Sequence, residues 1–296
     1  MAILGAHMSV GGGLHKAIEA AVALKMDTVQ IFTSSPSQWA AKPLESAAIE
    51  AWHKCWKTSG LVQPIAHASY LINLAGADDL FKKSVDALVD QWQRCEALHL
   101  TGLVVHPGAF TKSSEVEGIA KVAEGIVEAM DRVSPTHCRL LLENTAGQGT
   151  CLGHRIDQLS RMLKLATKHD KRAKKHVGVC IDTCHAFAAG YPIHEEAGLI
   201  AFCSELSDLL PKDAVRALHL NDSKKPLGSR VDRHEHIGLG ALGLKAFERI
   251  LNDSPLANIP GYLETEKGID EGSGFEWDAI NLQTLRTLTR SSKVVA

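Results

Sequence analysis

Three short apolar segments in the middle of the chain decide the fold: LVVH at 103–106, LLLE at 140–143 and VGVCID at 177–182. Between them, residues 116–130 and 156–167 carry apolar side chains at every third or fourth position, which is the spacing of an amphipathic helix. Short apolar runs that alternate with helices are typical of parallel strands buried on both faces. The stretch therefore predicts three consecutive strand–helix units.

The same unit recurs along the whole chain. The further apolar runs, and one further helical pattern, lie at residues 3–6, 28–32, 64–67, 215–219 and 262–264, and at 80–98. Eight units in about 260 residues predict an α/β fold, a single-domain (β/α)8 TIM barrel over residues 1–296. An open doubly wound sheet is the alternative, but it usually carries a GxGxxG turn, which Gly11-Gly12-Gly13 lacks. We interpret these glycines as a tight loop before a helix rather than as a phosphate cradle.

The composition is that of an ordinary globular protein, with 45% hydrophobic and 22% charged residues among 296. A net charge of −2 does not indicate a nucleic-acid partner, although bound metal ions would change the sum. The N-terminus resembles no signal peptide, and no apolar run of about 18 residues predicts a membrane span. Seven cysteines without a CxxC pair predict unligated thiols in an intracellular protein.

A histidine or a carboxylate follows almost every predicted strand. His7 follows the first strand, and nine further side chains follow the later ones: His67, His106, Glu143, Asp182, His185, His219, Asp232, His234 and Glu264. In such a barrel the C-terminal ends of the strands meet at one mouth, where catalytic groups lie. Buried carboxylates are normally paired or bound to metal, so the pattern predicts a metal centre at this mouth.

The donor types narrow the choice of metal. Imidazole nitrogen with carboxylate oxygen, and without thiolate, suits zinc and also manganese, iron or cobalt. Calcium and magnesium prefer sites made of oxygen alone. Nine ligands are too many for one ion and fit two or three.

Longer motifs surround these residues: LENTAGQG at 142–149, VCIDTCHAFAAG at 179–190, LHLND at 218–222 and GSRVDRH at 228–234. With them, the chain resembles the endonuclease IV family of zinc-dependent apurinic/apyrimidinic (AP) endonucleases over nearly its whole length. The resemblance implies a DNA-repair hydrolase that cleaves the phosphodiester 5′ of abasic sites in duplex DNA. The products would be a 3′-hydroxyl and a 5′-deoxyribose phosphate, and 3′-blocking groups would also be trimmed.

The resemblance also implies three zinc ions, with manganese or another transition metal as an alternative in part of the site. Glu143 would bridge two ions beside the hydroxide that they activate, which gives it the catalytic role. The implied ligands are His67, His106 and Glu143 for the first ion, Glu143, Asp182, His219 and Glu264 for the second, and His185, Asp232 and His234 for the third.

The predicted DNA contacts are Tyr70, Gln38 and Arg230. Tyr70 matches a family residue that enters the duplex at the lesion, and the alternative is a tyrosine that anchors its own loop. Gln38 lies in a loop that departs from the family, because Ser35-Pro36-Ser37 replaces the common Asn-Gln-Arg and an arginine is missing. Arg230 belongs to a loop that contacts phosphates or is merely solvated.

The most basic run, residues 168–176, precedes a strand and should lie opposite the metals. We interpret it as solvated surface, with a localisation signal as the alternative. The partner is expected to be damaged double-stranded DNA and the protein a monomer, cytoplasmic in a prokaryote or nuclear, also mitochondrial, in a eukaryote. Two rivals remain open: a metal-dependent sugar isomerase or epimerase of the same fold, and a lesion-binding protein with little catalysis.

Overall fold

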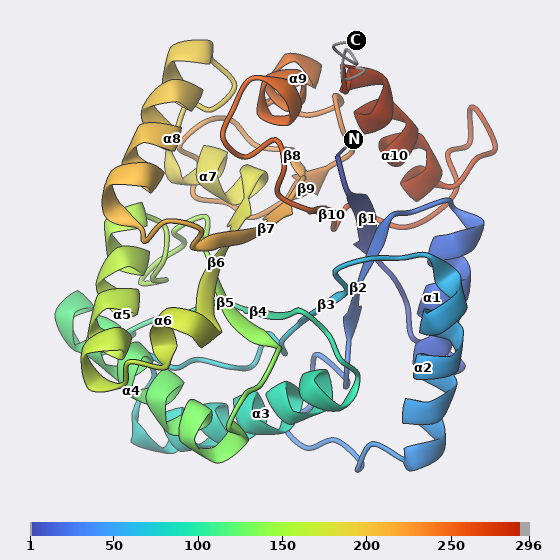
Figure 1. The fold of residues 1–296 in the computed structure, drawn as a ribbon. Helices are drawn as coiled ribbons and strands as arrows, with labels where there is room; N and C mark the ends of the chain where they lie inside the picture. Colours follow the sequence, from blue (N-terminus) through green and yellow to red (C-terminus); the bar gives the residue numbers. More distant parts are fainter. Residues whose placement is uncertain (1, 291–296) are drawn as a thin grey trace, which may run out of the picture.

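Eight parallel strands close into a barrel in the computed structural model, which describes residues 2–290 (Figure 1). Their order around the barrel is β1-β10-β7-β6-β5-β4-β3-β2. The strands are β1 (Leu4–His7), β2 (Thr28–Phe32), β3 (Ile65–His67), β4 (Gly102–Val105), β5 (Arg139–Glu143), β6 (Val177–Asp182), β7 (Val215–His219) and β10 (Gly261–Leu263). The predicted TIM barrel is confirmed, while residues 1 and 291–296 of the predicted domain lie outside the described residues.

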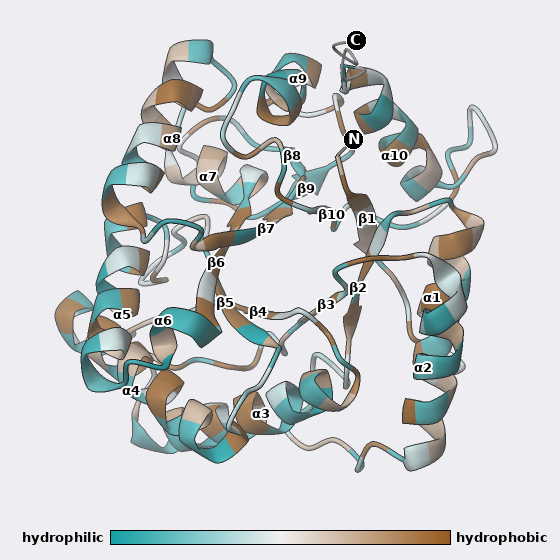
Figure 2. Ribbon diagram, viewed as in Figure 1, coloured by the Kyte–Doolittle hydropathy of each residue, from teal (hydrophilic) through white to brown (hydrophobic). Residues whose placement is uncertain are grey.

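Helices surround the barrel on its outside (Figure 1). They are α1 (Leu14–Ala23), α2 (Ser46–Ser59), α3 (Asp78–Ala97), α4 (Glu115–Val133), α5 (Ile156–His169), α6 (Ala173–His176), α7 (Thr183–Ala189), α8 (Glu196–Leu209), α9 (Leu244–Asn252) and α10 (Trp277–Leu288). A short antiparallel pair, β8 (Asp222–Ser223) and β9 (His234–Glu235), lies between β7 and α9 in the sequence. Figure 2 shows mostly hydrophobic residues in the barrel strands and mixed hydropathy on the helices, as a core between the two layers requires.

The strand boundaries agree with the predicted runs to within one residue at each end. Pro64, predicted as the start of a strand, lies just outside β3, because proline has no N–H to donate to a ladder. The predicted tight loop before the first helix is present: Gly12 and Gly13 have φ angles of 82° and 125°, which favour glycine.

The interior of the barrel explains how the strands position the site. A buried layer of mainly apolar side chains fills the barrel, made of Ile65, Val104, Leu141, Cys180, Ala217 and Tyr262. Because side chains alternate between the faces of a strand, the residue two positions later points inward as well. Those residues are His67, His106, Glu143, Asp182, His219 and Glu264. Six predicted ligands therefore form one layer above the apolar layer.

The basic run 168–176 covers the end of α5, a turn and α6, directly before β6 begins. It lies on the N-terminal side of the barrel, opposite the layer of predicted ligands, as expected from the sequence. Among residues 2–290, no helix combines the length and the apolar character needed to cross a membrane.

Candidate metal centre

The carboxylate of Glu143, at the end of β5, lies at the centre of the mouth and is completely buried. Its Oε2 is 3.1 Å from Nε2 of His67 and 3.0 Å from Nε2 of His106. Its Oε1 is 2.8 Å from Nδ1 of His219 and 3.3 Å from Nδ1 of His185. The two oxygens face different sets of imidazoles, which is the arrangement expected of a carboxylate shared by two cations.

Two groups of side chains at this mouth have the donor types and the spacing of metal sites. Within each group, one donor atom of every side chain lies within 4.8 Å of the others. The groups are His67, His106 and Glu143, and Glu143, Asp182, His219 and Glu264. They coincide with the sets that the family resemblance implies for the first two ions.

A third group forms around Asp232, in the loop before β9. Its Oδ2 is 3.1 Å from Nε2 of His185, and its Oδ1 is 3.2 Å from Nε2 of His234. Asp182 and Cys184 also lie within ligand distance of His234. All seven cysteines are free of disulfides. That none of them binds a metal stays a prediction, and Cys184 is the cysteine that tests it, because it lies near Asp232 and His234.

Hydrogen bonds to the backbone determine which ring nitrogen of three histidines carries the proton. Nδ1 donates to a carbonyl oxygen at 2.7 Å in His67, 2.9 Å in His185 and 3.2 Å in His234. A carbonyl only accepts, so the neutral form of each ring, which is the form that binds metal, has its lone pair on Nε2. Nε2 of His185 and of His234 is buried and lacks a hydrogen-bond partner, although Asp232 is close to both. Lone pairs that face carboxylates in this way fit a metal ion between them.

The imidazoles and carboxylates shift one another's pKa in opposite directions. Burial would raise the pKa of Glu143, but His219 and His106 outweigh it and hold that pKa well below its ordinary value. Burial would lower the pKa of His234, but Asp182 and Asp232 raise it to about 9. Without ions the cluster therefore holds protons at neutral pH, and an ion that binds must displace them.

Gln30, on β2, connects three side chains of the mouth and was not among the predicted site residues. Its Oε1 accepts from Nε2 of His219 at 2.8 Å, and its Nε2 donates to Oε1 of Glu264 at 2.6 Å. Its Nε2 also donates to Nδ1 of His7 at 3.0 Å. Because His219 donates from Nε2, the neutral form of this ring has its lone pair on Nδ1, which faces Glu143. The sequence did contain a signal for Gln30. It is a polar residue in an apolar strand, two positions after Thr28, and the same period of two residues places the predicted ligands.

Two asparagines from the quoted motifs orient Asp182. Nδ2 of Asn221 donates to its Oδ2 at 2.6 Å, and Oδ1 of Asn144 accepts from its backbone N–H at 2.6 Å. The backbone N–H of His185 donates to its Oδ1 at 2.7 Å. The carboxylate is thus held in one orientation before any ion binds, as is common around metal ligands.

A cavity of about 490 Å³ opens above the ligands, lined also by Tyr70, Lys224 and Arg233. Tyr70 is 61% exposed, and its ring centroid is 5.3 Å from that of His67. Gln38 and Arg230 are exposed and do not line this cavity. The predicted roles of Tyr70, Gln38 and Arg230 in DNA binding stay predictions.

The loop of Ser35-Pro36-Ser37, for which the sequence predicts a departure from the family, lies beside the loop of Tyr70. Oγ of Ser69 donates to the carbonyl of Pro36 at 2.7 Å, which connects the loop after β2 to the loop after β3. This contact holds Ser35-Pro36-Ser37 next to the loop of Tyr70.

Comparison with known proteins identifies the family. Residues 18–286 match the sequence model of the family described as "Xylose isomerase-like TIM barrel". The protein named "Probable endonuclease 4" from Chloroflexus aggregans is 43% identical over 287 residues, which cover 97% of each chain. The chain belongs to the endonuclease IV family. The family predicted from the motifs is therefore confirmed.

Solved structures agree with this assignment. Endonuclease IV from Thermus thermophilus matches with a TM-score of 0.83 and 34% identity, over 96% of this chain and 98% of that one. A D-tagatose 3-epimerase-like protein matches with a TM-score of 0.71 and 19% identity, over 96% of each chain, which shows the shared fold alone. As a member of the endonuclease IV family, the chain is a metal-dependent enzyme with candidate metal-binding groups at the mouth of its barrel.

Proposed function

We propose that the chain hydrolyses the phosphodiester 5′ of abasic sites in duplex DNA, leaving a 3′-hydroxyl and a 5′-deoxyribose phosphate, and trims 3′-blocking groups. Membership in the endonuclease IV family makes it an AP endonuclease of DNA repair. The observation that carries the reaction is the buried carboxylate of Glu143 between two groups of donors, at the mouth where substrates of this fold bind.

Three zinc ions suit the donor groups, with manganese or another transition metal as an alternative in part of the site. Bound divalent ions supply Lewis-acid chemistry, since they activate water near neutral pH and neutralise a leaving oxygen. Four ligand carboxylates and three such ions leave a local charge of about +2, which attracts phosphate. The proposed ligands are His67, His106 and Glu143; Glu143, Asp182, His219 and Glu264; and His185, Asp232 and His234.

The side chains themselves perform orientation and charge placement. Glu143 sets the separation of the two groups that share it, and Gln30 holds His219 and Glu264 in the orientation that aims their donor atoms at the mouth. These groups are in position before substrate arrives, which reduces the reorganisation needed in the transition state.

DNA binding is assigned to Tyr70, Gln38 and Arg230 at the rim. An abasic site lacks one base, so an aromatic ring can occupy the gap and replace the lost stacking. The exposure of Tyr70 beside the cavity supports this role. Lys224 and Arg233 add two cations at the cavity, where they can contact phosphates.

The proposed substrate is damaged double-stranded DNA, and the proposed active form is a monomer. All nine proposed ligands come from one chain, which supports a site that is complete without a partner subunit. The relatives named above are bacterial, which supports a cytoplasmic location rather than a nuclear one.

The test is incubation of the zinc-loaded protein with an end-labelled duplex that contains one tetrahydrofuran abasic analogue. A single cut 5′ of the analogue, ending in a 3′-hydroxyl, is expected, and a matched duplex without the analogue should remain intact. Binding without cleavage would contradict the enzyme and favour a lesion-binding protein. Isomerisation of a free sugar without DNA cleavage would favour the epimerase alternative.

A further inference from the structure

A basic cavity of about 410 Å³ lies on the N-terminal side of the barrel, away from the metal centre. Its walls come from the second half of α5, the basic run before β6 and the first residues of β5 and β7. Seven of its fourteen lining residues are Lys or Arg, and Asp213 is the one acid among them. The whole chain has 32 basic and 34 acidic residues, so this local excess of positive charge is strong.

The cations of this cavity lack ion-pair partners within residues 2–290. Arg139 starts β5 and Arg216 is the second residue of β7, and burial together with nearby Arg216 lowers the pKa of Arg139. By contrast, Arg172, next to the cavity in the sequence, pairs with Asp131 and Asp170. Unpaired cations gathered in a concave site repel one another, and an anion would remove that repulsion.

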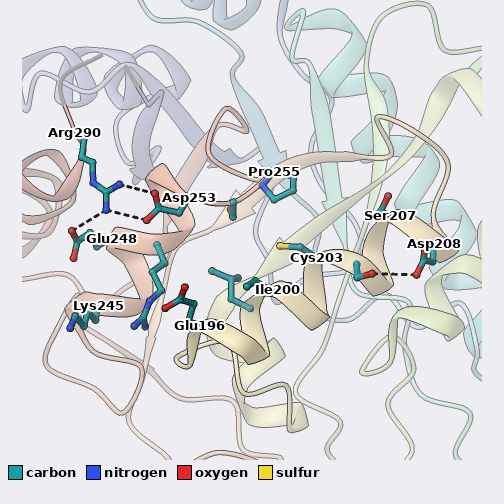
Figure 3. Close-up of a pocket in the computed structure, with 14 residues that line it drawn as sticks. Glu196, Ile200, Cys203, Ser207, Asp208, Lys245, Glu248, Asp253, Pro255 and Arg290 are labelled. Carbon is teal, nitrogen blue, oxygen red and sulfur yellow. Dashed lines mark hydrogen bonds and ion pairs between the residues drawn. The ribbon is translucent and has the colours of Figure 1, made fainter. Parts of the chain in front are cut away.

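A larger cavity elsewhere is lined by acidic as well as basic side chains. It measures about 680 Å³ and lies between α8 and α9 (Figure 3). Its Arg290 pairs with Asp253 at 2.7 Å and with Glu248 at 3.6 Å. The acids in that cavity pair with Arg290 and outnumber the cations that line it, so size alone does not make a site there.

The end of helix α5 explains only part of the basic cavity. Cations near a helix C-terminus stabilise the helix dipole, and Lys168 in the last turn of α5 has that position. Arg139, Arg216 and Lys212 belong to strands or to the segment before β7, so the same explanation does not apply to them. Their convergence with Lys168 therefore gives the cavity a positive charge that the helix dipole does not explain.

We propose that this cavity binds a compact polyphosphate anion, either inorganic polyphosphate or the polyphosphate group of a nucleotide. The volume lies in the range of small-molecule sites, and Lys and Arg are the usual phosphate-binding side chains. None of the lining residues is aromatic, so the cavity offers no platform on which the bases of a nucleic-acid strand could stack. A compact anion is favoured over a second DNA strand for that reason.

The location is tested by acylation of lysines in the zinc-loaded protein, read by mass spectrometry. Tripolyphosphate should slow the acylation of Lys168, Lys171 and Lys212, and leave that of Lys54 and Lys57 on α2 unchanged. A chelator without phosphate controls for removal of zinc and should protect none of the five. Equal protection by ATP would assign a nucleotide source, and protection by tripolyphosphate alone an inorganic one.

The contribution of the cations is tested with the double variant Lys168→Glu/Lys212→Glu. Because the variant reverses two charges in the cavity, the Kd for tripolyphosphate should rise at least about tenfold, against less than about twofold for the charge-matched control Lys54→Glu/Lys57→Glu. AP-site incision should be unchanged in both variants. Equal Kd values in the two variants, or stronger protection of these lysines by undamaged DNA at the same phosphate concentration, would overturn the proposal.

Discussion

Two of the fully buried carboxylates near the mouth of the barrel, Glu143 and Asp222, have completely different surroundings. Glu143 has imidazole nitrogens around both of its oxygens. Asp222, just after β7, accepts hydrogen bonds from five backbone N–H groups at 2.8–3.3 Å. The donors are Ser223 and Leu242 to Oδ1, and Gly238, Gly240 and Gly243 to Oδ2.

The difference distinguishes a structural carboxylate from the one that we propose to bind metal. Buried charges are stable when fixed dipoles surround them, and Asp222 uses the peptide groups of residues 238–243 in this way to hold a loop. Glu143 instead faces imidazole rings, which can carry either protons or metal ions beside it. Burial of a carboxylate is thus common to both roles, and the identity of its partners distinguishes them.

The largest effect is expected for Glu143→Gln, which keeps the size of the side chain and removes the shared charge. Incision of abasic DNA should fall at least ~10³-fold, because the activation that bound ions provide depends on that charge. The measurements are single-turnover incision and zinc content by elemental analysis, with about three ions expected in the unaltered protein. Near-normal turnover in the variant would rule out the bridging role.

Asp222→Asn is expected to affect stability rather than chemistry. Its amide group cannot accept all five N–H donors, so the free energy of unfolding should drop by about 2–3 kcal/mol. Zinc content and incision per folded molecule should stay normal. Asp208→Asn, at an exposed position on α8, is the matched control and should leave the denaturation midpoint unchanged. Lost zinc in Asp222→Asn would erase the distinction between the two carboxylates.

Tyr70→Ala removes an exposed aromatic side chain at the mouth that is not among the proposed ligands. Loss of base–aromatic stacking should weaken binding of abasic DNA by ~1–3 kcal/mol, roughly 5- to 150-fold. Trimming of a 3′-blocked end should suffer less, because less stacked duplex must open there. Fluorescence anisotropy and the two activities are measured alongside zinc content. Equal losses of both activities, or lost zinc, would show that the tyrosine anchors its loop.

Much of the fold and of the ligand set could be predicted from strand patterns. The period of two puts the residue two positions after each inward apolar side chain on the same face, so His67 and Glu143 were recognisable at strand ends. Asp232 and His234 come from a loop, and only the resemblance to the family grouped them with His185. A strand pattern cannot reveal tautomers. It also cannot distinguish Asp222 from Glu143, because both carboxylates come at or shortly after the end of an apolar strand.

Gln30 was missed because a single amide in an apolar strand has no metal-ligand chemistry of its own. Gln30→Leu keeps the approximate volume and removes the three hydrogen bonds to His219, Glu264 and His7. Zinc affinity should fall about 10- to 100-fold, the usual effect of removing a partner that orients a ligand. Competition with a chelator of known affinity measures this, and Gln30→Glu, which can still accept from His219, should retain more affinity than Gln30→Leu.

The smallest effect, and the one that tests the ion-free cluster itself, is the exchange of protons for metal. Burial opposes a proton on His234, but Asp182 and Asp232 raise its pKa from 6.5 to about 9. The proton therefore stabilises the ion-free protein fully below pH 6.5, and that stabilisation disappears as the pH rises through about 9.

Zinc must displace this proton at pH 7–8, so the apparent affinity for zinc should increase up to about tenfold per pH unit and level off above pH 9. Calorimetry in buffers of different ionisation enthalpy should detect at least one released proton per chain at pH 7.5. Zinc uptake without proton release would contradict this expectation, because it would show that the imidazole of His234 is already neutral before the ion binds.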